Sequence, residues 1–361
     1  NVDYEKLAEI KSGLIQTKEE LKKLEPIVAN IQLTKEDLAK VIEMWTGIPA
    51  AKIEQSEYGK ISELETHLKA KVIGQDEAVS LVVAAVKRSR VQLNKRKRPA
   101  SFIFVGPTGV GKTELVKCLA EELFETTDPL IRFDMSEFME KHAVSRLVGA
   151  PPGYVGYEEA GQLTERVRRK PYSVVLFDEI VKAHPDVMNI LLQILDEGKV
   201  TDAQGRTVSF QNTVIVMTSN AGSSDKSNIV GFNKQAGEMA KEKAMRALQE
   251  ILRPELLGRV DEIVVFSSLS QESMQKIAGL MLDEMKEPLK EQNIDMSYDE
   301  KALNYLAQHA DGGKFGAREL RKIIRKKVED RVANMIVDHY DSPITMLGIT
   351  ADENDIQIIA K

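Results

Sequence analysis

The stretch from Ser101 to Thr113 constrains this chain more than any other, because an apolar run leads directly into a glycine-rich loop and then a helix. Phe102–Val105 predicts a short buried strand, and Glu114–Leu123 continues with residues that favour a helix. The loop between them matches the pattern G-x-x-x-x-G-K-[ST] with Gly106, Pro107, Thr108, Gly109, Val110, Gly111, Lys112 and Thr113. Strand, loop and helix in this order are the context in which the pattern binds nucleotide phosphates.

The loop predicts binding of both the nucleotide phosphates and a Mg²⁺ ion. Its glycines let backbone N–H groups curl around phosphate oxygens, and the following helix N-terminus adds partial positive charge. We expect Lys112 to reach the β- and γ-phosphates and the Thr113 hydroxyl to ligate Mg²⁺. The alternative is a glycine-rich turn that matches by chance, and the flanking strand and helix argue against it.

The composition fits a multidomain protein without a strong global charge. The chain has 361 residues, 42% hydrophobic content and a net charge of −6, which indicates two or three domains at about 150 residues each and no general attraction to nucleic acid. Cys118 is the single cysteine, so no internal disulfide is possible, and we expect a reducing, cytoplasmic setting. No apolar run reaches the ~18 residues of a membrane span. Because the sequence begins at Asn1, we expect it to be a piece of a longer chain.

Three segments differ in their patterns. Residues 1–52 predict a helical linker in which Leu7, Leu14 and Leu21 form a heptad seam, either as a hairpin packed on the main domain or as a regulatory coiled-coil arm. Residues 53–267 predict a large ATPase domain, and residues 268–361 a smaller, mainly helical α+β domain. In the large domain we expect an α/β fold with a parallel five-stranded sheet and helices on both faces. Its strands are expected at 102–105, 130–134, 174–179, 213–220 and 263–266.

Polar residues at the ends of two strands would add metal-binding and water-orienting groups to the phosphate-binding loop. Asp178 and Glu179 end an apolar strand, where Asp178 suits the shell of a Mg²⁺ ion and Glu179 suits a base that orients water. If another strand lies between this one and the phosphate-loop strand, Asn220 at its tip would hold the attacking water. Strand-capping carboxylates and a turn asparagine are the ordinary alternatives.

In their order, these motifs resemble the AAA+ ATPases of the Clp/Hsp-hundred family, specifically the second ATPase ring of the ClpC and ClpE type. The matching stretches are Val72–Gln75, Gly106–Thr113, Gly153–Gly156, Phe177–Ile180, Lys182–Pro185, Thr218–Asn220, Arg253–Glu255 and Gly316–Arg318. The resemblance implies that Val72 and Ile73 pack on the adenine, that Asn220 is the first sensor and that Arg318 is the second sensor on the γ-phosphate. It also implies that Arg259 is an arginine finger acting on a neighbour's nucleotide in a homo-hexamer.

The resemblance extends to loops that would handle protein substrates. Tyr154 and Val155 match a pore loop that grips a polypeptide, and the hairpin around Asp202–Gly205 matches a second pore loop. Val230, Gly231 and Phe232 resemble the tripeptide with which ClpC- and ClpE-like proteins dock on a ClpP-type peptidase, and which ClpB-like proteins lack. A Phe232 folded back on its own domain is the alternative.

Two positions depart from the family pattern. Val181 stands where similar proteins usually carry Glu, and Gly258 stands where ClpB- and ClpC-like sequences usually carry Asn. The first departure puts a contact between neighbouring subunits in doubt, while both carboxylates and the finger are retained.

The function predicted is that of an ATP-dependent unfoldase that passes unfolded or misfolded polypeptides through a pore to a ClpP-type peptidase. A ClpB-like disaggregase without a protease is the first alternative. A nucleic-acid motor would rest on the basic run at 87–98, which lacks interleaved aromatic residues and is typical of a solvated face. A non-catalytic scaffold is the last alternative.

Overall fold

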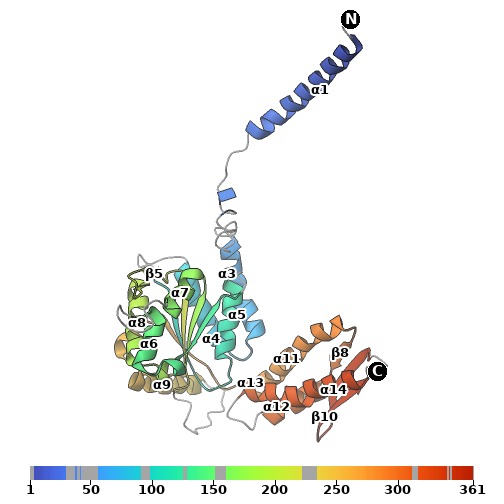
Figure 1. Ribbon diagram of the computed structural model, residues 1–361. Coiled ribbons are helices and arrows are strands. Elements are labelled where there is room, and N and C mark those ends of the chain that lie inside the picture. The colour runs from blue at the N-terminus through green and yellow to red at the C-terminus, as the bar shows by residue number, and fades with distance from the viewer. Residues whose placement is uncertain are drawn as a thin grey trace. The chain divides into compact units, whose positions relative to one another are not determined.

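The computed structural model describes residues 4–29, 37–38, 41, 56–90, 98–124, 128–150, 160–221, 234–310, 316–339, 341 and 344–360. These belong to two compact units, residues 1–57 and 58–361. The first unit contains helix α1 (Tyr4–Ala29; Figure 1). Ile10, Leu14 and Leu21 of this helix are more than half exposed. The division of the chain at residues 52 and 267 stays a prediction.

A five-stranded sheet organises the second unit. Its order is β2-β3-β6-β1-β7, and every neighbouring pair is parallel, which confirms the predicted fold class. The strands are β1 (Ala100–Val105), β2 (Leu130–Asp134), β3 (Val174–Asp178), β6 (Val214–Ser219) and β7 (Glu262–Val265). Every residue of β1 and β6 is buried, because helices cover both faces of the sheet, and this explains their continuous apolar sequences.

Alternate residues of β1 enter two different cores. Ile103 and Val105 lie in one core, and Phe102 and Phe104 lie in the other. Helices on the first side are α6 (Lys141–Val148), α7 (Gln162–Arg169), α8 (Pro185–Glu197), α9 (Lys234–Ile251) and α10 (Pro254–Leu257). Helices on the second side are α3 (Ser56–Lys71), α4 (Asp76–Arg90) and α5 (Lys112–Leu123).

The strand order brings three loops to one edge of the sheet. β6 lies between β3 and β1, as the sequence analysis required for Asn220. Val105 pairs with Ser219 and Phe177 with Met217, so these strands end next to one another. Because the strands are parallel, the segments that follow them leave the sheet at the same edge, where ligands of α/β folds bind. A separate hairpin of β4 (Lys199–Thr201) and β5 (Thr207–Ser209) follows α8.

The C-terminal part forms its own core of helices and a three-stranded sheet. Its elements are α11 (Gln271–Glu291), β8 (Asp295–Tyr298), α12 (Glu300–Ala310), α13 (Ala317–Ile324), a π-helical turn (Arg325–Glu329), α14 (Asp330–Asp338), β9 (Met346–Ala351) and β10 (Ile356–Ala360). The sheet order is β10-β9-β8, with β8 parallel to β9. Strand β8 is not predicted from the sequence, because Met296 is its single buried residue. Among the described residues, no helix is long and apolar enough to cross a membrane.

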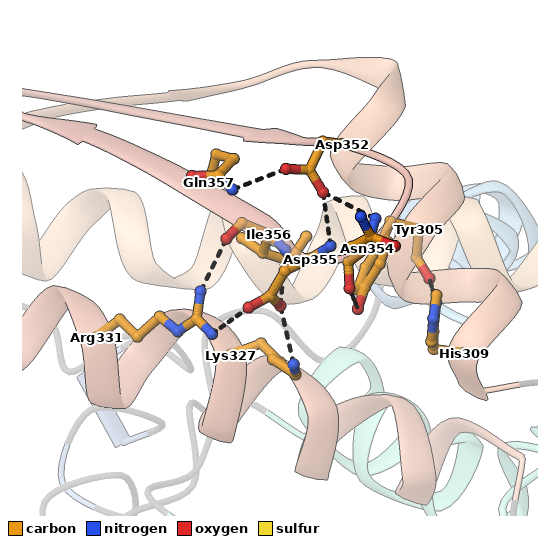
Figure 2. Close-up of polar contacts among 9 residues, drawn as sticks. All are labelled: Tyr305, His309, Lys327, Arg331, Asp352, Asn354, Asp355, Ile356 and Gln357. Carbon is orange, nitrogen blue, oxygen red and sulfur yellow. Dashed lines mark hydrogen bonds and ion pairs between the residues drawn. The ribbon is translucent and has the colours of Figure 1, made fainter.

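Charged groups fasten the final hairpin to α14 and the π-helical turn (Figure 2). The Asp355 carboxylate accepts hydrogen bonds from Lys327 Nζ at 2.8 Å and Arg331 Nη2 at 2.5 Å, while Arg331 Nη1 donates to the Ile356 carbonyl at 2.8 Å. These two cationic partners lower the pKa of Asp355. The contacts of Asp355 with Lys327 and Arg331 therefore link the turn before β10 to the helices packed against it.

Candidate nucleotide-binding site

The loop after β1 has the backbone shape that an anion site needs. Gly106, Gly109 and Gly111 all have positive φ, at 151°, 78° and 104°. A Cβ on Gly106 would lie 2.5 Å from the Phe266 carbonyl oxygen, so no side chain fits there. Gly111 is the N-cap of α5, which places the free N–H groups of the helix start at the loop.

Lys112 lies inside this loop rather than in solvent. Its side chain is 8% exposed, and Nζ donates to the carbonyl oxygens of Gly106 at 2.5 Å and Pro107 at 2.7 Å and to Asn220 Oδ1 at 2.8 Å. Burial lowers the pKa of Lys112 to about 8; Arg318 adds to this effect, while Asp178 and Glu179 oppose it. Lys112 and Asn220 are therefore in direct contact, and three charged residues of the predicted set act on the same ammonium group.

Asp178, at the end of β3, holds its carboxylate between a hydroxyl and a cation. Thr218 Oγ1 donates to one carboxylate oxygen at 2.5 Å, and Arg132 Nη2 donates to the other at 2.6 Å. The side chain of Asp178 is 13% exposed. Together with the half-buried Thr113 hydroxyl at the start of α5, it offers the hard oxygen donors that Mg²⁺ prefers.

Glu179 has an unusual backbone conformation, and its carboxylate has a different cationic partner from that of Asp178. Its φ is 57°, a left-handed conformation that is uncommon outside glycine and concentrates at functional sites. Its N–H donates to Thr218 Oγ1 at 3.0 Å, and its carboxylate forms an ion pair with Lys182. Thr218 thus contacts both acidic residues.

The predicted adenine contacts and second sensor approach the same loop. Val72 is buried, and its Cγ1 lies 3.6 Å from the position a Cβ on Gly111 would take, while Ile73 is half-buried. From the C-terminal part, the Ala317 N–H donates to the Gly109 carbonyl at 3.0 Å. This contact places α13, which carries Arg318, at the phosphate-binding loop.

Arg259 is not part of this cluster. It precedes β7, whose first residue Glu262 pairs with Phe102, so it lies at the edge where the parallel strands begin. There its guanidinium forms an ion pair with Asp196 near the end of α8. The loop and the acidic residues lie at the opposite edge.

Some predicted residues lie outside the described part of the chain. These are Tyr154 and Val155 of the pore loop and Val230, Gly231 and Phe232 of the docking tripeptide. The second predicted pore loop is described: Asp202 is buried and caps the β4–β5 turn by accepting from the N–H groups of Gln204 and Arg206 at 3.0 and 2.8 Å.

The structure shows no special packing or backbone requirement at the two positions that depart from the family pattern. Val181 is half-buried against the core beside α8. Gly258 has φ −73°, a helical conformation open to any residue, so its backbone does not require glycine. In the described part of the basic run, Arg88 and Arg98 are paired with Glu262 and Asp261 at 2.6 and 2.9 Å, as expected of a structural rather than a nucleic-acid-binding surface.

Four residues that shape the site were given no role by the sequence. Thr218, Arg132, Lys182 and Gln75 contact the acidic pair or the loop. Thr218, Lys182 and Gln75 lie in stretches that match the family, and Arg132 is a charged residue between the apolar Ile131 and Phe133 of β2.

Two family models match the chain. Residues 97–263 match the AAA domain (Cdc48 subfamily), and residues 269–343 match the C-terminal, D2-small domain of ClpB protein.

Curated relatives include proteins of both the chaperone and the protease-associated type. A probable chaperone protein ClpB 1 of Chlorobaculum tepidum is 48% identical over 93% of this chain and 80% of its own length. The negative regulator of genetic competence ClpC/MecB of Bacillus subtilis is 51% identical over 85% of this chain and 39% of its own length. The ATP-dependent Clp protease ATP-binding subunit ClpE of the same organism is 49% identical over 90% of this chain and 46% of its own length. The chain thus spans less than half the length of several relatives.

A solved structure has the same fold. It is described as a closed-state reconstruction of Hsp104 with ATPγS and FITC casein, and it superposes with a TM-score of 0.79 at 35% identity. The match covers 91% of this chain and 56% of that chain.

Proposed function

Because the chain belongs to the Clp/Hsp-hundred family of AAA+ ATPases, we propose that it uses ATP hydrolysis to unfold polypeptides and thread them through a hexameric pore into a ClpP-type peptidase. The observation that carries the ATPase part is the contact of Lys112 with the loop and with Asn220, next to the acidic pair at one edge of the sheet. A cytoplasmic setting is part of the proposal and rests on the single cysteine.

Each residue at this edge has a task in hydrolysis. The loop N–H groups and Lys112 bind the phosphates, and Glu179 accepts a proton from the attacking water that Asn220 positions. Thr113 and Asp178 would hold Mg²⁺, which when bound neutralises charge on the phosphate oxygens. The Lys112 ammonium group already lies inside the loop, where it donates to the carbonyl oxygens of Gly106 and Pro107. When nucleotide binds, phosphate oxygens would replace these carbonyl oxygens as acceptors.

The location of Arg259 supports action between subunits. Its own phosphate-binding loop lies at the other edge of the sheet, so Arg259 needs the nucleotide of a neighbouring protomer. An arginine supplied in trans stabilises transition-state charge in related phosphoryl-transfer enzymes. Arg318 would act within its own protomer, because α13 contacts Gly109 of the same chain.

Threading is tested by changing Tyr154. Tyr154→Ala should leave ATPase activity near that of the wild type and abolish unfolding of a stable fluorescent protein that carries an unstructured tail. Loss of fluorescence at the wild-type rate would refute the pore-loop role. The ATPase rate of the same preparation controls for folding.

Peptidase docking is tested by deleting Val230–Phe232. The deletion should preserve unfolding and abolish degradation by purified ClpP, and persistent degradation would contradict the docking role. A disaggregase is the second candidate function, because ClpB relatives are as similar to this chain as ClpC and ClpE relatives. Reactivation of an aggregated enzyme without any degradation by the ClpP mixture would favour that candidate.

A further inference from the structure

Gln75 is a buried side chain that joins two distant parts of the chain. It is 4% exposed and lies between Gly74 and the start of α4. Its Nε2 donates to the Val110 carbonyl at 3.1 Å and to the Ser267 carbonyl at 2.9 Å, and its Oε1 accepts from the Ser267 N–H at 3.2 Å. Both amide hydrogens and the amide oxygen are therefore used.

The two partners belong to functionally different segments. Val110 lies within the phosphate-binding loop, between Gly109 and Gly111. Ser267 lies in the connection between β7 and α11, where the ATPase domain leads into the small C-terminal domain. One planar amide thus holds the loop and this connection in a fixed relation.

Further contacts bring the small domain to the same loop. A Cβ on Gly74 would lie 2.7 Å from Ser273 Oγ in the first turn of α11, so the turn before Gln75 fits closely against that helix. The carbonyl of Gly109, next to Val110, accepts from the Ala317 N–H of α13. Consecutive carbonyls of the loop are therefore held by the small domain itself and by Gln75.

We propose that Gln75 is a positioning residue that transmits movement of the phosphate-binding loop to the connection before α11, so that bound nucleotide sets the position of the small domain. This inference rests on the proposed ATPase function. If the loop moves on binding phosphate, the Val110 carbonyl moves with it. Because breaking a buried hydrogen bond leaves costly unpaired groups, the amide and Ser267 follow. A glutamate lacks the two donors, and a methionine of similar size lacks all three groups.

The test measures small-domain position with and without nucleotide. Spin labels on Lys117→Cys of α5 and Gln308→Cys of α12, both exposed positions, report the distance between the domains by electron-electron resonance; the native Cys118 is buried. The probe is Mg²⁺ with ATPγS, and its affinity is measured by calorimetry. Gln275→Met is the matched control, because Gln275 donates to Asn304 within the small domain and does not reach the loop.

Wild type and Gln275→Met should show the same change of distance when ATPγS binds. Gln75→Met should bind ATPγS within about tenfold of wild type, since its side chain is not a phosphate ligand, yet show less than half of that change. Gln75→Glu keeps the acceptor for Ser267 and should show the same loss, which covers the case in which the methionine variant fails to fold.

Three results would overturn the inference. A full distance change in Gln75→Met or Gln75→Glu shows that the amide does not transmit movement. A wild type that binds ATPγS without any change of distance rules out the coupling while leaving the ATPase function intact. A wild type that does not bind ATPγS refutes the proposed function itself, and the inference with it.

Discussion

Replacing Thr218 by valine tests whether a buried hydroxyl holds the two acidic residues in place. Thr218 is 2% exposed; its Oγ1 donates to Asp178 at 2.5 Å and accepts from the Glu179 N–H at 3.0 Å. Valine has almost the same shape but lacks both interactions. The substitution therefore removes hydrogen bonds without opening a cavity.

The size of the effect follows from those two bonds. A hydrogen bond to a charged group contributes about 1.5–3 kcal/mol, and an unpaired buried N–H costs about 1–3 kcal/mol. The added methyl group offsets about 0.8 kcal/mol. At the lower end of these ranges, we expect a net loss of about 2 kcal/mol in the free energy of unfolding. If a similar amount is lost from the transition state because Asp178 and Glu179 are no longer oriented, kcat falls about 30-fold at 1.36 kcal/mol per tenfold.

The assay combines steady-state ATP hydrolysis with urea unfolding. Thr213→Val is the matched control, because Thr213 is also 2% exposed, precedes the same strand and donates to the Phe210 carbonyl at 2.8 Å, but lies at the opposite end of β6. It should lose about 1 kcal/mol of stability with unchanged kcat. Thr218→Ser should retain most activity. The reasoning is wrong if Thr218→Val keeps kcat within twofold, or if Thr213→Val loses as much.

Four further changes have defined outcomes. Glu179→Gln should bind ATP normally in calorimetry and lower kcat at least ~100-fold; unchanged turnover would remove Glu179 as the base. Arg259→Ala should lower ATPase activity about 1000-fold, and mixing it with Glu179→Gln protein should restore part of the activity through shared sites; no recovery in rings shown to be mixed would contradict action in trans. Gly316→Ala, at φ 52° with its Cβ 2.7 Å from a carbonyl oxygen of the phosphate-binding loop, should weaken ATP binding about tenfold, whereas Gly205→Ala, at φ 80° in open space, should not. Asp355→Asn should cost about 1 kcal/mol at pH 7 by urea unfolding. Because the pKa of Asp355 lies below its ordinary 3.8 in the folded chain, this difference should persist above that pH and shrink as the pH falls below it; a difference that is constant with pH would refute the ion-pair origin.

The sheet and the candidate site could be predicted from short sequence patterns, because the glycine loop and the buried strands each carry their own local signal. The loop from Gly106 to Thr113 carries its geometry in its own glycines, and strand order at a parallel sheet edge then brings Asp178 and Asn220 near it. Continuous apolar strands identified the sheet because both of its faces are covered. The short β8 escaped prediction because one buried side chain produces no periodic pattern.

The supporting contacts could not be read from the sequence because they join residues far apart in it. Thr218 meets Asp178 across 40 positions, and Gln75 meets Ser267 across 192. Both side chains lie in stretches that match the family, but those stretches do not show which groups the side chains contact. Only the pairing of β3 with β6, and the packing of the turn before α4 on the β7–α11 connection, place them.

The position of Arg259 links the sheet topology to the proposed ring. β1 and β7 pair over four residues, so at about 3.3 Å per residue the two ends of this ladder lie roughly 10 Å apart. Arg259 precedes one end, and the phosphate-binding loop follows the other. An arginine at the starting edge of a parallel sheet lies on the far side from its own site whatever rotamer it adopts, and its ion pair with Asp196 holds it there. If Arg259 acts in hydrolysis, it must therefore act on the nucleotide of a second protomer. The edge of that protomer's sheet that carries the phosphate-binding loop would have to face Arg259.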